Sequence, residues 1–263
     1  DIEPGEVIVF DDHGVQTHKP FPPMPPRPCL FEYIYFARPD SVIGGRSVYD
    51  VRKAIGAELA HESPVAADVI VPVPDSGVPA AIGYSQASGL PFELGIIRNH
   101  YVGRTFIQPT QSVRELGVRM KHSANRAAIH GKRIVLIDDS LVRGTTSKKI
   151  VKMMRDAGAR EVHFRIASPP ITHPDYYGID MPDRASLLAA NHTLEEMRQI
   201  VGADSLAFLS VDGLYRAMGE PGRDPAHPKF TDHYFTGEYP TPLTDLTQTE
   251  AQPRQLSLLA EAS

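Results

Sequence analysis

Cysteine and long apolar runs are scarce in this sequence. Its 263 residues include one cysteine, Cys29, which cannot form a disulfide within the chain, and this is typical of proteins in a reducing cytoplasm. No run of about 18 apolar residues is present, so we expect no transmembrane helix, and no signal-peptide pattern opens the chain. The chain begins at Asp1 rather than at methionine, so we expect a longer parent sequence upstream. Together these features predict a cytoplasmic protein without membrane contact.

The charge balance argues against a nucleic-acid partner. The net charge is −5, and 41% of the residues are hydrophobic. An acidic chain offers no overall electrostatic attraction to nucleic acid, and this hydrophobic content suffices for one sizeable domain with appendages. The eleven histidines show no spacing typical of metal ligands.

The two ends of the chain differ in pattern from its middle. Residues 1–19 read as two short strands cut off from their partners. Residues 20–30 form a proline-rich linker, with six prolines in nine consecutive positions, which is typical of an extended, semi-rigid spacer. We therefore place the main domain at 31–222 and a C-terminal extension at 223–263, whose last part has no pattern and is expected to be disordered.

Strand-like and helix-like segments alternate through the middle of the chain. Ser47 can cap a helix that carries Val48, Val51, Ile55 and Leu59 on one face. Strands are predicted at 68–73, 92–98, 133–138, 161–168 and 205–210, and helices at 78–89, 145–158, 183–190, 193–201 and up to Met218. Such alternation predicts an α/β fold with a mostly parallel sheet and helices on both of its faces.

The stretch RIVLIDDSLVRGTTSKKI, residues 133–150, ends a buried strand on two adjacent carboxylates. In open α/β sheets, ligands bind beyond the carboxyl ends of the strands, where Asp138 and Asp139 are expected. Adjacent strand residues point to opposite faces, so the two aspartates are not expected to act as an acid–base dyad unless the strand has already ended. Two carboxylates can accept hydrogen bonds from the hydroxyls of a diol, or bind a divalent cation.

The loop after these aspartates offers donors to an anion. The backbone N–H groups of Arg143, Gly144, Thr145, Thr146 and Ser147 are expected to be unpaired at a helix N-terminus, and three hydroxyls add to them. One ligand with hydroxyls at one end and a phosphate at the other, such as a ribose 5-phosphate, fits both halves of the stretch. The alternative is an ordinary capped helix after a strand, with both aspartates as turn residues. Neither a Walker A loop nor a G-x-G-x-x-G fingerprint occurs.

The sequence VLIDDSLVRGTTS resembles the signature of type I phosphoribosyltransferases, which bind phosphoribosyl pyrophosphate (PRPP), and in particular the glutamine PRPP amidotransferase family. The resemblance extends to FEYIYFARPDS (31–41), VPDS (73–76), NHYVGRTFIQP (99–109), YGIDMP (177–182) and IVGADSLAFLS (200–210). It spans about residues 30–220 and implies the type I phosphoribosyltransferase fold. It also implies that residues 1–19 are the last strands of a missing N-terminal glutaminase domain.

The resemblance implies an activity and partners. Members of that family attack PRPP with ammonia released from glutamine, giving 5-phosphoribosylamine and pyrophosphate in the first committed step of purine synthesis. A response to AMP and GMP and a homo-oligomer, either dimer or tetramer, are further expectations, and in this chain the ammonia would come from the missing glutaminase domain. Two other functions stay open: a salvage phosphoribosyltransferase that accepts a purine or pyrimidine base, and a PRPP-sensing regulator without catalysis.

The resemblance also assigns roles to single residues. The residues expected to hold pyrophosphate are Asp75, Ser76 and Gly77. Asp75 could instead cap the helix that follows it. Ser76, Asp138 and Asp139 stand where the family coordinates Mg²⁺, and the two aspartates are the expected catalytic groups. The loop of residues 143–147 is the expected site for the 5-phosphate of the substrate.

Residues 98–126 form a cationic segment in an acidic protein. The segment holds six basic residues, Arg98, Arg104, Arg114, Arg119, Lys121 and Arg126, against one acid, Glu115. A long segment without periodicity inside a compact domain is typical of a lid over a site, and a solvated basic surface loop is the alternative. By resemblance, Tyr101 is expected to bind substrate, and Arg104 and Lys121 are expected to take part in catalysis.

Cys29 stands where some members of the family place the first of four cysteines that hold an iron–sulfur cluster. The other three would align near Asp175 and within 228–235, where no cysteine occurs, and a single cysteine cannot hold such a cluster. We therefore expect no cluster, and a packing role for Cys29. Three aromatic residues are expected in the core: Tyr33, Tyr35 and Phe36.

Overall fold

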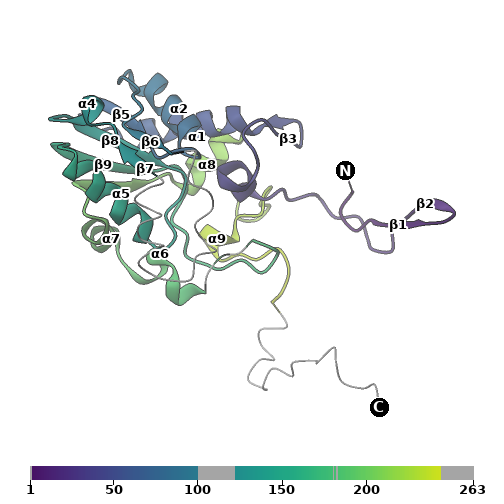
Figure 1. The fold of residues 1–263 in the computed structure, drawn as a ribbon. Coiled ribbons are helices and arrows are strands. Elements are labelled where there is room, and N and C mark those ends of the chain that lie inside the picture. Colours follow the sequence, from purple (N-terminus) through teal and green to yellow (C-terminus); the bar gives the residue numbers. More distant parts are fainter. Residues whose placement is uncertain (1, 100–121, 180, 182, 244–263) are drawn as a thin grey trace, which may run out of the picture.

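The computed structural model describes residues 2–99, 122–179, 181 and 183–243. Its centre is a four-stranded sheet in the order β10–β9–β8–β5 (Figure 1), and all neighbouring strands are parallel. The strands are β5 (Val69–Pro72), β8 (Arg133–Asp138), β9 (Glu161–Ile166) and β10 (Ser205–Phe208). Because β5 and β8 are buried almost throughout, their apolar runs are continuous rather than alternating. The strand β9 is equally buried, but its apolar residues alternate with His163 and Arg165. The predicted parallel sheet is confirmed.

Helices cover both faces of this sheet (Figure 1). On one face lie α1 (Val48–Glu62), α2 (Val78–Ser88) and α8 (Val211–Ala217), and on the other α5 (Thr145–Asp156) and α7 (Leu194–Val201). The side chains of β8 divide between the two layers: Val135 and Ile137 join the core under α1, whereas Ile134 and Leu136 join the core under α5. Among the described residues, no helix is long and apolar enough to span a membrane.

The helix α1 follows the predicted pattern at both its cap and its buried face. Ser47 caps it by accepting a hydrogen bond from the Asp50 amide at 3.3 Å. Its buried face carries Val48, Val51, Ile55 and Leu59, as expected. The same face also contains Arg52, a charged residue among apolar ones.

Two glycines let α1 and α2 cross in close contact. A Cβ atom at Gly56 would lie 1.9 Å from the carbonyl oxygen of Ala80, and one at Gly83 would lie 1.9 Å from that of Lys53. No side chain larger than hydrogen fits at either point. The crossing holds the start of α2 close to the sheet, and with it the loop that leaves β5.

Long-range pairing changes several predicted boundaries. The strand expected at 92–98 is divided: Phe92 forms an isolated bridge with Ile70, and β6 (Ile96–Arg98) pairs antiparallel with β7 (His122–Ala124). The helix expected at 183–190 is two short turns, η3 (Arg184–Ser186) and α6 (Leu188–Asn191). Smaller elements absent from the prediction are β3 (Val42–Ile43), β4 (Arg46–Ser47), α4 (Arg126–Ile129) and α9 (His233–Thr236).

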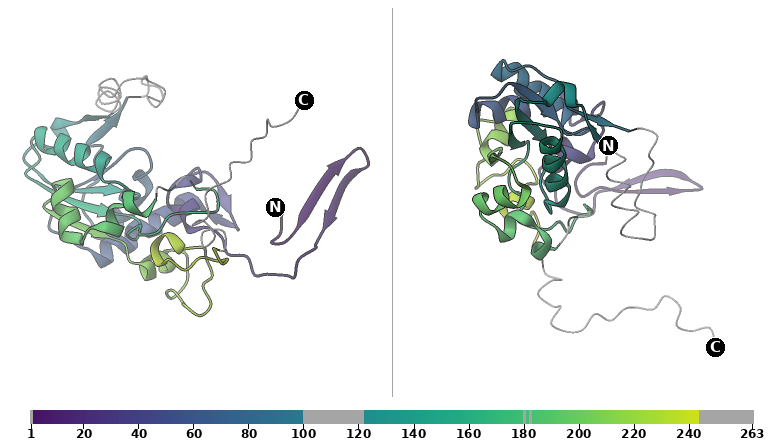
Figure 2. Two further views of the ribbon diagram at one scale, coloured as in Figure 1. Left: turned by 90° about the horizontal axis from the view of Figure 1, so that it is seen from below. Right: turned by 60° about the vertical axis from the view of Figure 1, so that its left-hand side comes forward.

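The N-terminal strands stand apart from the main body. Strands β1 (Val7–Asp11) and β2 (Gly14–His18) form an antiparallel hairpin that is largely exposed and extends away from the sheet (Figure 2). The proline-rich residues 20–27 are exposed and lack regular structure. The chain joins the body at Leu30, whose amide donates to the Thr231 carbonyl at 3.2 Å.

Part of the segment after residue 222 packs onto the core. Phe230 and Tyr234 are buried in the same cluster as α1, and Cys29 is partly buried and packs against that cluster. The packing role expected for Cys29 is therefore confirmed. The segment is further fixed by Arg223, which donates to the buried Asp232 carboxylate at 2.6 Å.

A single turn of π-helix, η1 (Glu32–Phe36), precedes α1. Tyr33 is buried, as expected, but Tyr35 and Phe36 are 50% and 48% exposed, so their expected place in the core is wrong. The reason is local: the turn directs Tyr33 and Ile34 inward and the next two rings outward, where they pack edge to face at 5.4 Å between centroids.

Candidate active site

The carboxyl end of β8 carries the two aspartates. Asp138 is the last residue of the strand, and Asp139 follows it. Their exposed fractions are 8% and 6%. The Asp139 amide donates to the Asp138 carboxylate at 3.0 Å, and the Ser140 hydroxyl donates to the Asp139 carboxylate. The structure thus places both groups where the sequence predicts them, but buried rather than in an open turn.

Burial makes negative charge unfavourable at this end of β8. Desolvation raises the pKa of Asp138 well above its usual value, and the charge of Asp139 raises it further. Desolvation also raises the pKa of Asp139, although the hydroxyls of Ser140 and Ser76 and the charge of Arg52 oppose this. A hydroxyl donor or a cation bound here would stabilise the charged form of both carboxylates. The site therefore favours the binding of such a group.

The loop after β5 lies beside these carboxylates. Residues Pro72 and Ile137 are partners in the β5–β8 register, and the Val73 amide donates to the Ile137 carbonyl at 2.8 Å. Ser76 reaches the carboxylate of Asp139. A Cβ atom at Gly77 would lie 2.6 Å from the Ile137 carbonyl oxygen, so glycine is required for the two loops to approach.

Asp75 does not cap the helix that follows it. The cap position of α2 is Gly77, which provides no side-chain acceptor. The carboxylate of Asp75 instead forms an ion pair with Arg98 at the end of β6. The peptide bond between Pro74 and Asp75 is cis. In this loop, the carboxylate of Asp75 is thus already paired with Arg98, a base of the predicted cationic segment.

The loop between β8 and α5 presents an uncapped helix N-terminus. Gly144 is the cap residue, with φ of 76°, and no side chain caps the first turn. A Cβ atom there would also lie 2.9 Å from Leu188, whose amide donates to the Val142 carbonyl at 2.8 Å. The first N–H groups of an α-helix have no partner within the helix, so this end of α5 favours an anion.

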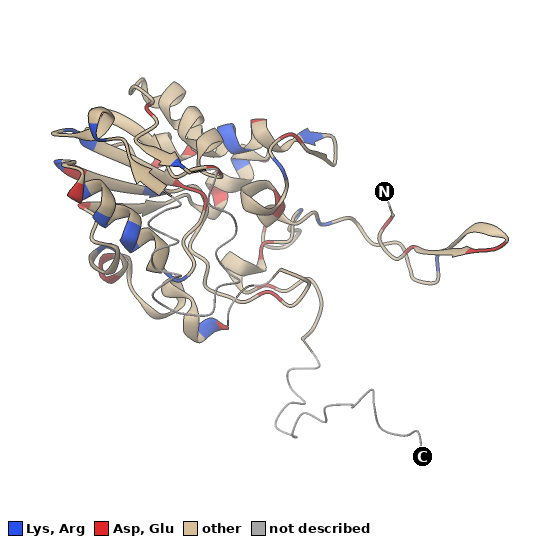
Figure 3. Ribbon diagram, viewed as in Figure 1, with Lys and Arg blue, Asp and Glu red and all other residues tan. Residues whose placement is uncertain are grey.

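Side chains of the same loop add to this anion site. Thr145 and Thr146 are exposed, whereas Ser147 is buried, and Arg143 is exposed at the tip of the loop. Figure 3 shows basic residues along α5, where Lys148 and Lys149 are exposed. Positive charge around a helix N-terminus favours the approach of a phosphate.

The donors at the site fit a hard cation that needs few protein ligands. Among the residues that the structure describes, no group of three or more His, Cys, Asp or Glu is arranged to hold a metal. The Ser76 hydroxyl acts on the buried carboxylate of Asp139, and the buried Asp138 precedes Asp139 at the end of β8. Mg²⁺ is commonly bound by one or two carboxylates together with substrate phosphates, so these oxygens fit it.

Three expected site residues, Tyr101, Arg104 and Lys121, lie outside the described residues. So does most of the predicted lid, residues 100–121. The ends of that segment are paired, since Arg98 faces His122 in the β6–β7 hairpin.

Sequence reasoning missed Arg52, whose charge acts on Asp139. A signal was present, because position 52 falls on the apolar face of α1, between Val48 and Ile55.

The surroundings of Cys29 contain oxygen and nitrogen groups. Its sulfur lies 3.1 Å from the Tyr234 hydroxyl. Nearby, His233 Nε2 lies 2.8 Å from the Asp175 carboxylate, and both side chains are fully buried. These contacts join the segment around residue 29 to two later segments of the chain.

Comparison with known proteins identifies relatives of this site. Residues 46–168 match the family described as phosphoribosyl transferase domain. An amidophosphoribosyltransferase of Rhizobium etli is 62% identical, over 99% of this chain and 53% of its own length. One of Bacillus subtilis is 52% identical, over 92% of this chain and 50% of its own length.

A solved structure shows similarity to the same group of proteins. The glutamine PRPP amidotransferase of B. subtilis, complexed with ADP and GMP, is similar with a TM-score of 0.81 and 52% identity, over 92% of this chain and 53% of that chain. The chain therefore spans about half the length of the relatives it matches. The family match over residues 46–168 includes β5, β8, β9 and both loops of the site.

Proposed function

Because this chain belongs to the amidophosphoribosyltransferase family, of which it spans the phosphoribosyltransferase part, we propose that its site transfers ammonia to PRPP. The products are 5-phosphoribosylamine and pyrophosphate, as in the first committed step of purine synthesis. The observation that carries the proposal is the pair of buried carboxylates, Asp138 and Asp139, beside the uncapped N-terminus of α5. One ligand with ribose hydroxyls and a 5-phosphate satisfies both.

Each loop has its own task in this proposal. The N–H groups and hydroxyls of residues 144–147 bind the 5-phosphate. Asp138 and Asp139 accept hydrogen bonds from the ribose hydroxyls, and residues 75–77 bind the pyrophosphate. Arg98, which pairs with Asp75 in the structure, is close enough to this loop to exchange that carboxylate for a phosphate oxygen.

The reaction needs no protein nucleophile. The bond between C1 of the ribose and pyrophosphate breaks, positive charge develops at C1, and the nitrogen of ammonia forms the new bond and then loses a proton. The two carboxylates stabilise the developing charge because they are fixed and buried. Asp138, Asp139 and Ser76 would hold Mg²⁺, whose charge offsets that of the departing pyrophosphate.

The wider setting follows the family. We propose that glutamine is the source of ammonia in the whole protein, that AMP and GMP act as inhibitors, that the assembly is a dimer or tetramer, and that the protein is cytoplasmic. A solved relative was complexed with ADP and GMP, which supports nucleotide binding.

The function is tested by incubating the chain with PRPP, Mg²⁺ and ammonium at alkaline pH, where free ammonia is present. Formation of 5-phosphoribosylamine, trapped by a coupled reaction, is the expected result. Release of pyrophosphate without the amine would contradict ammonia transfer. Omitting Mg²⁺ and omitting ammonium are the controls.

A further inference from the structure

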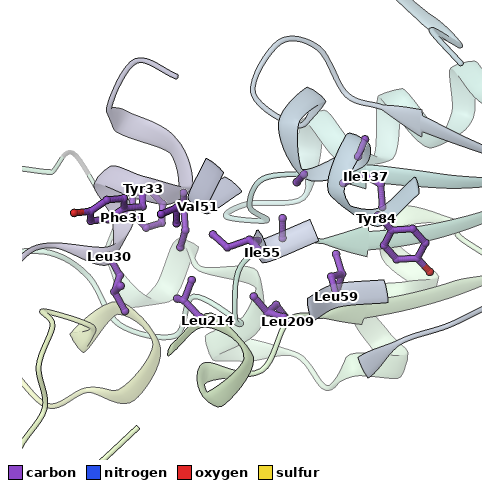
Figure 4. Close-up of a cluster of buried hydrophobic side chains, with 14 of the residues drawn as sticks. Leu30, Phe31, Tyr33, Val51, Ile55, Leu59, Tyr84, Ile137, Leu209 and Leu214 are labelled. Carbon is purple, nitrogen blue, oxygen red and sulfur yellow. The ribbon is translucent and has the colours of Figure 1, made fainter. Parts of the chain in front are cut away.

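The loop between β5 and α2 is anchored at its base and carries one exposed acid. The Val73 amide donates to the Ile137 carbonyl at 2.8 Å, and Ile137 is fully buried in the core (Figure 4). Residues 73–78 read VPDSGV, so Asp75 is the one charged side chain of this loop, and it is exposed. A carboxylate at this point repels the pyrophosphate proposed to bind here unless a cation compensates it.

The chain that follows α2 runs beside β5 and brings Arg98 to the same loop. The Glu93 amide donates to the Ile70 carbonyl at 2.9 Å, and a Cβ atom at Gly95 would lie 2.8 Å from the side chain of Val71. The strand β6 begins directly after this glycine and ends at Arg98. Contacts along β5 therefore place Arg98 next to the loop that leaves this strand.

Arg98 and Asp75 form an ion pair that a ligand can reach. Nη1 of Arg98 donates to Oδ2 of Asp75, and the two side chains are 38% and 56% exposed. Ion pairs at this exposure contribute little to stability, because water solvates both charges. A guanidinium binds phosphate and carboxylate oxygens in the same geometry, so a phosphate of the substrate can replace the carboxylate.

We propose that Asp75 is an internal competitor for the pyrophosphate of PRPP, with Arg98 as the group for which the two compete. The carboxylate holds the guanidinium until a pyrophosphate oxygen replaces it, and takes it back when pyrophosphate leaves after the transfer. Arg98 makes the site selective for a ligand that carries pyrophosphate, and Asp75 limits how tightly that product is held. The inference rests on the proposed function of the site, in which the backbone N–H groups of residues 75–77 bind the same pyrophosphate.

Two substitutions should change the affinity for PRPP in opposite directions, measured by calorimetry with Mg²⁺. Arg98→Gln removes the cation and should raise Kd about tenfold, the scale of a lost charge-assisted hydrogen bond. Asp75→Asn keeps the shape and removes the competing charge, so Kd should fall about threefold, the scale of an exposed ion pair. Both side chains lie at the surface, so both variants should fold. Weaker binding of PRPP to Asp75→Asn would overturn the proposal.

A double-mutant cycle distinguishes competition from simple neutralisation of charge. If Asp75 competes for Arg98, then Asp75→Asn has no donor to release once Arg98 is replaced, and the double variant binds PRPP as weakly as Arg98→Gln does. Arg98→Gln then raises Kd about thirtyfold in the Asp75→Asn background, against about tenfold in the native chain. If Arg98 only neutralises Asp75, the order is reversed, and Arg98→Gln costs less once the acid is gone. That order would overturn the proposal, as would additive effects.

Ligands with and without pyrophosphate locate the effect within the site. Ribose 5-phosphate lacks the group that competes with Asp75, so both substitutions should leave its Kd unchanged within about twofold. Inorganic pyrophosphate with Mg²⁺ should follow PRPP in both directions. Equal changes for ribose 5-phosphate and PRPP would contradict an exchange at the pyrophosphate loop.

Arg155→Gln is the matched control for Arg98→Gln. Arg155 pairs with Asp204 at 2.8 Å and its side chain is 37% exposed, which is close to the exposure of Arg98. Asp204 directly precedes β10, so this pair lies at the amino end of a parallel strand, opposite the site. Arg155→Gln should leave the Kd for PRPP unchanged within about twofold. Equal losses of affinity in the two variants would overturn the role of Arg98.

Binding and turnover separate this inference from the proposed function. If the chain binds PRPP and pyrophosphate with these differences but forms no 5-phosphoribosylamine, ammonia transfer fails and the competition stands. If the amine forms but Kd responds to neither substitution, the competition fails and the proposed function stands. If neither PRPP nor pyrophosphate binds to the unsubstituted chain, both are overturned.

Discussion

Replacing Asp138 by asparagine should make the protein more stable and less active. Asp138 is buried, and desolvation followed by the charge of Asp139 raises its pKa well above the usual value. The asparagine has nearly the same shape, and its Oδ1 can still accept the Asp139 amide, which donates at 3.0 Å to the native carboxylate. The substitution therefore removes a charge without removing this hydrogen bond.

The expected increase in the free energy of unfolding of Asp138→Asn follows from the cost of a buried charge. Substitutions that remove buried charge without leaving a partner behind stabilise proteins by about 1–3 kcal/mol. For a chain of this size such a gain raises the melting midpoint by roughly 2–10 °C. Loss of one preorganised electrostatic partner should lower kcat by about 10²–10³-fold. Stability and activity thus change in opposite directions.

The gain in stability of Asp138→Asn over the native chain should depend on pH. Because the folded-state pKa of Asp138 is raised, the native protein holds this proton more tightly than the unfolded chain does. The stability linked to that proton is fully present below the unfolded value of about 3.9, and it is lost as pH rises through the folded pKa. Asp138→Asn should therefore exceed the native chain in stability at pH 8 and match it near pH 4.

Thermal unfolding with EDTA at both pH values, and kcat with PRPP and ammonium, provide the measurements. Asp156→Asn is the control, because Asp156 is exposed and pairs with Lys152 on the surface of α5, where a change of less than about 0.5 kcal/mol is expected. Lower stability of Asp138→Asn at pH 8 would refute the claim of unfavourable charge. Near-native turnover would refute the catalytic assignment.

Three further changes test the rest of the fold. Gly83→Ala places a methyl group against the Lys53 carbonyl and should lower the free energy of unfolding in urea by about 1–3 kcal/mol. Asp175→Ala removes the acceptor of buried His233 and should cost more than about 2 kcal/mol in the same assay. Hydrogen bonds from Arg133 lower the pKa of Asp68 to about 2, so this pair stabilises the fold above about pH 4. That stability is lost as pH falls towards 2, and an acid titration of Asp68→Asn should lack this loss.

The sequence predicts the strand before the two aspartates and the helix start after them well, because local rules govern both. The apolar run 134–137 is buried on both faces, as parallel strands require, and the polar residues after it mark the strand's end. Gly144 and the hydroxyls after it mark a turn into a helix. These signals lie within a few residues of one another, so no knowledge of distant contacts is needed.

Distant contacts and one local turn explain the predictions that were wrong or missing. The segment 92–98 is apolar enough for one strand, but a Cβ atom at Gly95 would lie 2.8 Å from Val71 and 2.7 Å from Ile129, and the chain beyond it pairs with β7 instead. Tyr35 and Phe36 are exposed because η1 places them on its outer side. Arg52 is buried because the carbonyls of Tyr33 and Ala37, earlier in the chain, accept its hydrogen bonds.

Ile137 contacts both the loop after β5 and the core of the domain. Its carbonyl accepts the Val73 amide at 2.8 Å and lies where a Cβ at Gly77 would clash, so it sets the distance between the loops after β5 and β8. Its side chain is fully buried in the core cluster on the side of the sheet covered by α1, α2 and α8, and Asp138 and Asp139 follow it directly in the chain. The burial of one apolar residue therefore ties the proposed pyrophosphate loop to the segment that carries the two carboxylates.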